Sequence, residues 1–167
     1  MMESVYVAVD VEWIALAYGD VVRVLESPEK FKSVVIASTA PFGVKADIDN
    51  MKVVLYDAPR DASRGAIHQD LQRRGFELKL GHVMERKQYN GSVSAVQKGV
   101  DVMLTVDVMT AMQSGIDTLI ILTSDTDFVP LLQQARFAGV KTAVIGRSGV
   151  SSQLTKVADV ACSLVMD

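Results

Sequence analysis

Short apolar runs, rich in β-branched residues, alternate with longer mixed stretches along this chain of 167 residues. Runs of four to eight such residues are typical of strands buried on both faces of a parallel sheet. The predicted strands are residues 4–9, 52–56, 76–80, 118–123 and 142–145, with a last edge strand at 163–165. The predicted helices are residues 11–26, 61–74, 128–138 and 152–157, and a long helix that begins at 93 or 98 and ends at 113. The alternation predicts an α/β fold in which crossover helices connect parallel strands.

Two segments fit this alternation less well. Residues 29–50 are compatible with a strand, a helix end or a lid, and the sequence leaves the choice open. Residues 81–91 are rich in charge and are expected to form an exposed loop. Because no repeat, low-complexity tract or linker divides the chain, we expect a single domain over residues 1–167.

The composition narrows the class of protein. A hydrophobic share of 49% with 22% charged residues is ordinary for a globular domain. The longest apolar runs are far shorter than the ~20 residues that cross a bilayer, and no basic leader precedes the first strand. The lone Cys162 excludes internal disulfides and thiolate zinc clusters. We therefore expect a cytoplasmic protein without a membrane partner.

Three aspartates follow predicted strands directly. Asp10 ends the first strand, and Asp125 and Asp127 come just after the fourth. Ligands of open α/β sheets bind at the carboxyl ends of the strands, and carboxylates gathered there repel one another unless a cation joins them. Mg²⁺ prefers carboxylate oxygens, and paired metal ions can clamp the oxygens of a phosphoryl displacement. Asp101, an acid in an otherwise apolar helical segment, needs a partner, a metal or solvent.

Simpler roles exist for these acids. Ser124, Asp125 or Asp127 can cap the helix that follows, although one cap explains only one acid. Asp10 can be a turn residue or a cap. We interpret Asp57 as a turn residue, Asp107 as supporting either the metal ligands or the fold, and Glu12 and Asp159 as structural. His68 and His82 are expected to be surface or loop residues. Motifs of P-loop, dinucleotide-binding, serine-hydrolase and zinc-protease sites are absent from the sequence.

Charge is unevenly distributed along the chain. The net charge of −3 argues against indiscriminate nucleic-acid binding. Residues 60–98, however, hold eight basic and four acidic residues, a net charge of +4, which leaves −7 for the remainder. This basic segment is either a track for a polyanion beside the metal site or a solvated helix face with a charged loop.

Four stretches together resemble the NYN branch of the PIN-like nuclease superfamily, of the LabA-like type. They are the strand ending VAVD at residues 7–10, VVLYD at 53–57, KGVDVMLTVD at 98–107 and TSDTDFVPL at 123–131. The resemblance covers nearly the whole chain except residues 28–50. It implies a three-layer α/β/α fold with a central, mainly parallel sheet, and an acidic pocket that binds Mg²⁺ or Mn²⁺ for the hydrolysis of RNA.

The resemblance also carries residue roles to this chain. It implies that the metal-binding and catalytic residues are Asp10, Asp101, Asp125 and Asp127. We expect RNA contacts from hydroxyl and basic residues near this cluster: Ser124, Thr126, Lys98, Arg60, Arg64, Arg86 and Lys87. The expected partner is single-stranded RNA, and the sequence leaves homodimer formation open.

One position departs from the family pattern. Trp13 stands where the family commonly has an asparagine that organises the acidic site, and an indole cannot replace the donor and acceptor of a carboxamide. We therefore interpret the chain as a metal-dependent endoribonuclease, with an inactive NYN scaffold that binds RNA or protein as the alternative. A third interpretation, a metal-dependent phosphatase or Toprim-like enzyme, is supported only by the Asp-x-Asp turn.

Overall fold

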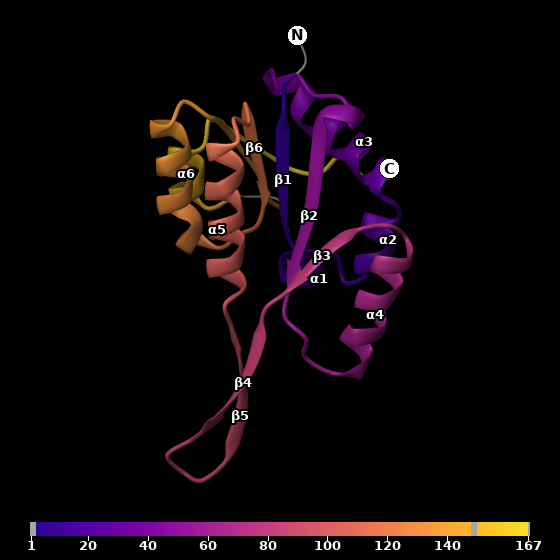
Figure 1. Cartoon of the computed structure of the whole chain (residues 1–167), viewed down its shortest axis with the longest axis vertical. Helices are drawn as coiled ribbons and strands as arrows, with labels where there is room; N and C mark the ends of the chain where they lie inside the picture. Colours follow the sequence, from indigo (N-terminus) through magenta and orange to yellow (C-terminus); the bar gives the residue numbers. More distant parts are fainter. Residues whose placement is uncertain (1–2, 148–149, 167) are drawn as a thin grey trace.

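Six parallel strands form the central sheet, in the order β3-β2-β1-β6-β7-β8 (Figure 1). The computed structural model describes residues 3–147 and 150–166, without the side chains at 83, 84, 86 and 94–98. The strands are β1 Val5–Asp10, β2 Met51–Asp57, β3 Glu77–Leu80, β6 Thr118–Leu122, β7 Lys141–Ile145 and β8 Val160–Cys162. β1, β2 and β6 are almost wholly apolar because both faces of the sheet are covered there.

Helices cover both faces, which confirms the three-layer α/β/α, PIN-like architecture. One layer contains α1 Val11–Tyr18, α2 Val21–Leu25, α3 Pro28–Thr39 and α4 Ala62–Arg73. The other contains α5 Val100–Gln113, α6 Val129–Phe137 and α7 Ser152–Val157 (Figure 1). Alternate residues of β1 point into two separate cores, Val7 and Val9 into the first and Tyr6 and Ala8 into the second. None of the helices in the described ranges is long and apolar enough for a bilayer crossing.

The main departure from the sequence prediction is a β-hairpin between β3 and α5. β4 His82–Lys87 and β5 Val93–Lys98 pair only with each other and project away from the layers (Figure 1). The predicted loop over residues 81–91 and the predicted helix start at residue 93 were therefore wrong. Gly91, with φ +84°, closes the turn, and the dipeptide Asn90-Gly91 is the hairpin signal that the prediction passed over.

Smaller differences from the prediction concern residues 11–50 and the last strand. The helix predicted over residues 11–26 is two helices, since Gly19 adopts φ +81° between α1 and α2. Pro28–Thr39 is a helix rather than a strand or a lid, with Ser27 as its N-cap. Two 3-10 turns, Ala40–Phe42 and Ile48–Asn50, then lead to β2. The edge strand β8 ends before the predicted residues 163–165.

The topology brings distant segments to one edge of the sheet. β1 pairs with β2 on one side and with β6 on the other. The order in which the strands are added to the sheet therefore reverses at β1. Such a switch point is where open α/β sheets bind ligands. α5 begins at the same edge, because Gly99 in the left-handed conformation (φ +88°) turns the chain from β5 directly into the helix. The ends of β1 and β6 and the first turn of α5 therefore meet.

Candidate metal centre

Three carboxylates meet at this edge. Asp101 from the first turn of α5 joins Asp125 and Asp127 from the turn after β6, and one carboxylate oxygen from each lies within 4.8 Å of the others. Burial raises the pKa of Asp101, and the negative charges of Asp125 and Asp127 raise it further. A set of three hard oxygen donors at this separation fits a divalent cation such as Mg²⁺ or Mn²⁺.

Local hydrogen bonds hold the turn after β6 in shape. The Thr123 hydroxyl accepts a bond from the Asp125 backbone N–H at 3.1 Å. Asp125 Oδ1 accepts one from the Asp127 backbone N–H at 2.8 Å, so Asp125 caps the 3-10 turn Thr126–Phe128 that precedes α6. The cap accounts for Asp125 alone, and Asp127 lies in the cluster without capping the turn.

Asp10 lies close to these carboxylates but outside the group of three. A cavity of about 440 Å³ is lined by Asp10, Asp101 and Asp125 together with further residues. Burial raises the pKa of Asp10 to about 6, against the opposing hydrogen bond from the Thr123 hydroxyl at 3.2 Å. Repulsion from Asp101 and Asp57 adds to the rise. Its role as a fourth metal ligand stays a prediction.

Asp10→Asn is expected to stabilise the metal-free protein by about 1–3 kcal/mol at neutral pH. The pKa of Asp10 rises on folding, from 3.8 to about 6, so the folded state binds the proton more tightly than the unfolded state. Stability of the parent therefore falls as the pH rises from about 4 to 6, and asparagine avoids this loss. Urea unfolding in EDTA measures the difference, which should vanish below about pH 4. A variant less stable than the parent at neutral pH would contradict the account.

Two further acids in the cavity are bonded to neighbouring arginine and histidine side chains. Asp57 is 1% exposed, and its Oδ2 accepts bonds from Arg64 Nη1 and from His68 Nε2, both at 2.8 Å. Glu12 binds Arg64 at 3.2 Å and Arg60 at 3.1 Å. Burial lowers the pKa of Arg64, but its bonds with Asp57 and Glu12 outweigh this, and the guanidinium stays charged.

This network corrects one sequence prediction and extends another. His68 is buried, at 4% exposure, and is not a surface or loop residue. Asp57 is more than a turn residue, because it anchors two side chains of α4 beside the metal centre. Arg64 and His68 are four residues apart and so share one face of a helix, which is the signal that could have revealed them.

The predicted RNA contacts surround the cavity to different degrees. Ser124 and Thr126 are exposed in the turn beside Asp125. Arg60 lies between β2 and α4 with its guanidinium on Glu12, and Arg64 is committed to the network below it. Three predicted contacts belong to the hairpin: Lys87 is exposed, and the side chains of Arg86 and Lys98 lie outside the described part of the chain.

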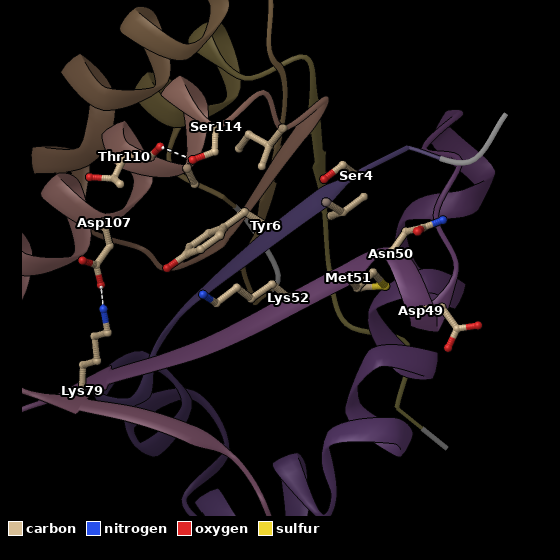
Figure 2. Close-up of a pocket in the computed structure, with 13 residues that line it drawn as sticks. Ser4, Tyr6, Asp49, Asn50, Met51, Lys52, Lys79, Asp107, Thr110 and Ser114 are labelled. Carbon is tan, nitrogen blue, oxygen red and sulfur yellow. Dashed lines mark hydrogen bonds and ion pairs between the residues drawn. The ribbon is translucent and has the colours of Figure 1, made fainter.

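Asp107 belongs to a different part of the molecule. The Tyr56 hydroxyl donates to Asp107 Oδ2 at 2.8 Å, Lys79 donates to the same oxygen at 2.7 Å, and the Tyr6 and Tyr56 hydroxyls are bonded to each other. Figure 2 shows the ion pair between Asp107 and Lys79, both of which line a cavity of about 500 Å³ formed by residues of α5, β1, β2 and β3 and the segments next to them. This chain of bonds anchors α5, and with it Asp101, to the sheet.

Tyr56→Phe is expected to cost about 1–3 kcal/mol of unfolding free energy. The change removes one hydroxyl and leaves Tyr6, which is 5% exposed, and Asp107 each short of a partner. Equilibrium unfolding in urea measures the loss. Tyr89→Phe serves as the control, because Tyr89 is fully exposed on the hairpin turn and its hydroxyl is in solvent. Equal stability of the two variants would show that the buried bonds contribute nothing.

The α/β/α layers and the acid cluster at the switch point define a protein of the PIN-like class. A family model described as NYN domain matches residues 4–164. The chain belongs to the NYN domain family, as its four motifs indicated.

Among the solved structures that resemble this chain, the first supports the fold. A protein of unknown function from Vibrio parahaemolyticus is 22% identical with a TM-score of 0.67, over 98% of this chain and 94% of that one. MurG from Acinetobacter baumannii is 12% identical with a TM-score of 0.43, over 98% of this chain and 42% of the other. No curated protein matches the sequence.

Proposed function

We propose that the protein is a cytoplasmic, metal-dependent endoribonuclease. The observation that supports this best is the meeting of Asp101, Asp125 and Asp127 within 4.8 Å, in a chain that belongs to the NYN domain family. Family membership suggests the nuclease fold, and the three carboxylates suggest a Mg²⁺ or Mn²⁺ site. Asp10, in the same cavity, is the fourth proposed ligand.

The residues in and around the cavity divide into two groups with different tasks. Asp101, Asp125 and Asp127 would hold the cation, which would supply Lewis-acid stabilisation of the phosphoryl oxygens. Arg64 and Arg60 compensate the charges of Glu12 and Asp57, and His68 adds a hydrogen bond to Asp57. Without this compensation six carboxylates would repel both one another and a phosphodiester.

A basic arm beside the acidic centre suggests how RNA approaches. The hairpin, residues 82–98, contains three basic residues and one acidic residue, while the chain as a whole has a net charge of −3. β5 leads through Gly99 into the first turn of α5, so the arm starts next to Asp101. We infer that Arg86, Lys87 and Lys98 attract the phosphate backbone of single-stranded RNA toward the cluster.

A second function is favoured by the surroundings of Trp13. Glu12 is the nearest candidate to replace the missing asparagine, yet both of its oxygens are bonded to arginines. If the Glu12 carboxylate stays bound to these arginines, it does not take the place of the asparagine. The chain is then an NYN scaffold that binds RNA without cutting it. Gel-shift and cleavage measurements on the same RNA separate the two functions.

The test is a cleavage assay on single-stranded RNA with Mn²⁺, comparing the parent with Asp125→Asn. We expect cleavage by the parent that EDTA abolishes, and none by the variant beyond the background. Cleavage that persists equally in Asp125→Asn belongs to a contaminant and contradicts the proposal. RNA that both proteins shift in a gel and neither cuts supports the scaffold instead.

A further inference from the structure

A third cavity lies beside the turn that follows β6. Its volume is about 280 Å³, and its lining includes Trp13, Leu16, Ser124, Arg147 and Val150. Thr123 lines this cavity, while its hydroxyl contacts Asp10 and the backbone of Asp125. The small cavity therefore adjoins the proposed metal centre, with Thr123 between them.

One wall of the cavity is apolar. The Trp13 ring is 4% exposed and is held edge-on by Tyr18, with ring centroids 5.8 Å apart. Leu16 is 78% exposed, an unusual exposure for a leucine beside a buried indole. Trp13 lines this cavity and is absent from the lining described for the acidic one. The residue that departs from the family pattern is thus a core residue that borders this cavity and not the acidic one.

The rim of the cavity carries a cation held in place. Arg147 donates from Nη1 to the backbone carbonyl of Ala17, and its guanidinium lies 5.5 Å from the centroid of the Tyr18 ring. Neither contact neutralises the positive charge. A guanidinium oriented in this way is suited to a phosphate group, which it can bind through its remaining N–H groups.

We propose that this cavity binds one nucleotide of the substrate strand, with the base against the exposed Leu16, next to the buried Trp13, and the phosphate at Arg147. The identity of the strand as RNA rests on the proposed function. The volume of 280 Å³ is just below the ~300–1,000 Å³ of pockets for drug-sized ligands, so it suits a single planar ring system. A base seated here lies beside Thr123 and Ser124, and the next residues of the same turn, Asp125 and Asp127, belong to the acid cluster.

Trp13 is the only tryptophan of the chain, so its fluorescence reports on this cavity alone. The experiment titrates the whole protein, without added divalent ions, with pentauridylate RNA and with an abasic ribose-phosphate strand of equal length. We expect a saturable change in Trp13 emission with pentauridylate and none with the abasic strand. Leu16→Ala and Arg147→Ala should each weaken pentauridylate binding at least about fivefold.

Phe137→Ala is the matched control for Leu16→Ala, because Phe137 is 88% exposed on α6 and lines neither cavity. Unchanged Trp13 emission, an equal response to the abasic strand, or equal affinities of Leu16→Ala and Phe137→Ala would each overturn the base site. RNA that changes Trp13 emission as expected and is not cut in the Mn²⁺ assay leaves the base site standing and contradicts the ribonuclease. RNA that is cut while Trp13 emission stays constant supports the ribonuclease and contradicts the base site.

Discussion

Replacing any one of Asp101, Asp125 and Asp127 with asparagine is expected to slow RNA cleavage at least about a hundredfold. Each substitution keeps the shape of the side chain and removes one negative charge from a set whose oxygens lie within 4.8 Å. Because the three residues act on the same ion, their effects should not add. The double variant Asp101→Asn with Asp125→Asn should be no more than severalfold slower than either single variant.

Initial cleavage rates at saturating Mn²⁺ measure this effect. Asp49→Asn is the control, because Asp49 is exposed in the 3-10 turn before β2, at the opposite edge of the sheet. The cluster variants should remain folded, since each relieves repulsion between carboxylates in the absence of metal. A clustered aspartate whose replacement leaves the rate at the level of Asp49→Asn is not part of the site.

Asp57→Ala is expected to lower the unfolding free energy by about 3–5 kcal/mol, the largest effect on stability that the structure suggests. Asp57 is 1% exposed and binds Arg64 and His68 through one oxygen. The Arg64 side chain is 12% exposed. Without Asp57, its guanidinium keeps Glu12 as its remaining carboxylate partner in the network. Urea unfolding at neutral pH measures the change.

A second substitution separates the effect of charge from that of the lost packing. Arg64→Met in the Asp57→Ala background removes the unpaired charge and keeps the length of the side chain, so it should restore part of the stability. Asp49→Ala, at an exposed site, should change stability by no more than about 0.5 kcal/mol. If the second change makes the protein still less stable, the cost of Asp57→Ala does not come from the buried arginine.

The sheet and the acid cluster were predictable because both depend on simple patterns. Apolar runs identified β1, β2 and β6, and aspartates at strand ends in a parallel sheet gather at one edge. Asp101 was harder, since it comes from a helix that the hairpin separates from β3. Asp101 is the lone acid of an otherwise apolar segment, which indicated that it needs a partner. The family motif indicated that this partner is a metal ion.

The rest depended on contacts that no local pattern specifies. The hairpin was missed because its composition is charged and mixed, like that of a loop, although Asn90-Gly91 marked the turn. His68 and Arg64 both contact Asp57 of β2, and Arg64 also contacts Glu12 of α1, which is distant in sequence, so their burial followed only from the packing of α4. Trp13 was identified as a departure from the family, but its place beside the third cavity required the fold.

A calorimetric titration of the metal-free protein with Mn²⁺ tests the cation site itself, independently of any RNA. The account predicts saturable binding to the parent, with an affinity at least about tenfold lower in Asp125→Asn. It predicts affinity close to that of the parent in Asp49→Asn. An absence of binding heat in the parent, or the same affinity in the parent and in Asp125→Asn, would contradict a metal centre at the joint ends of β1, β6 and α5.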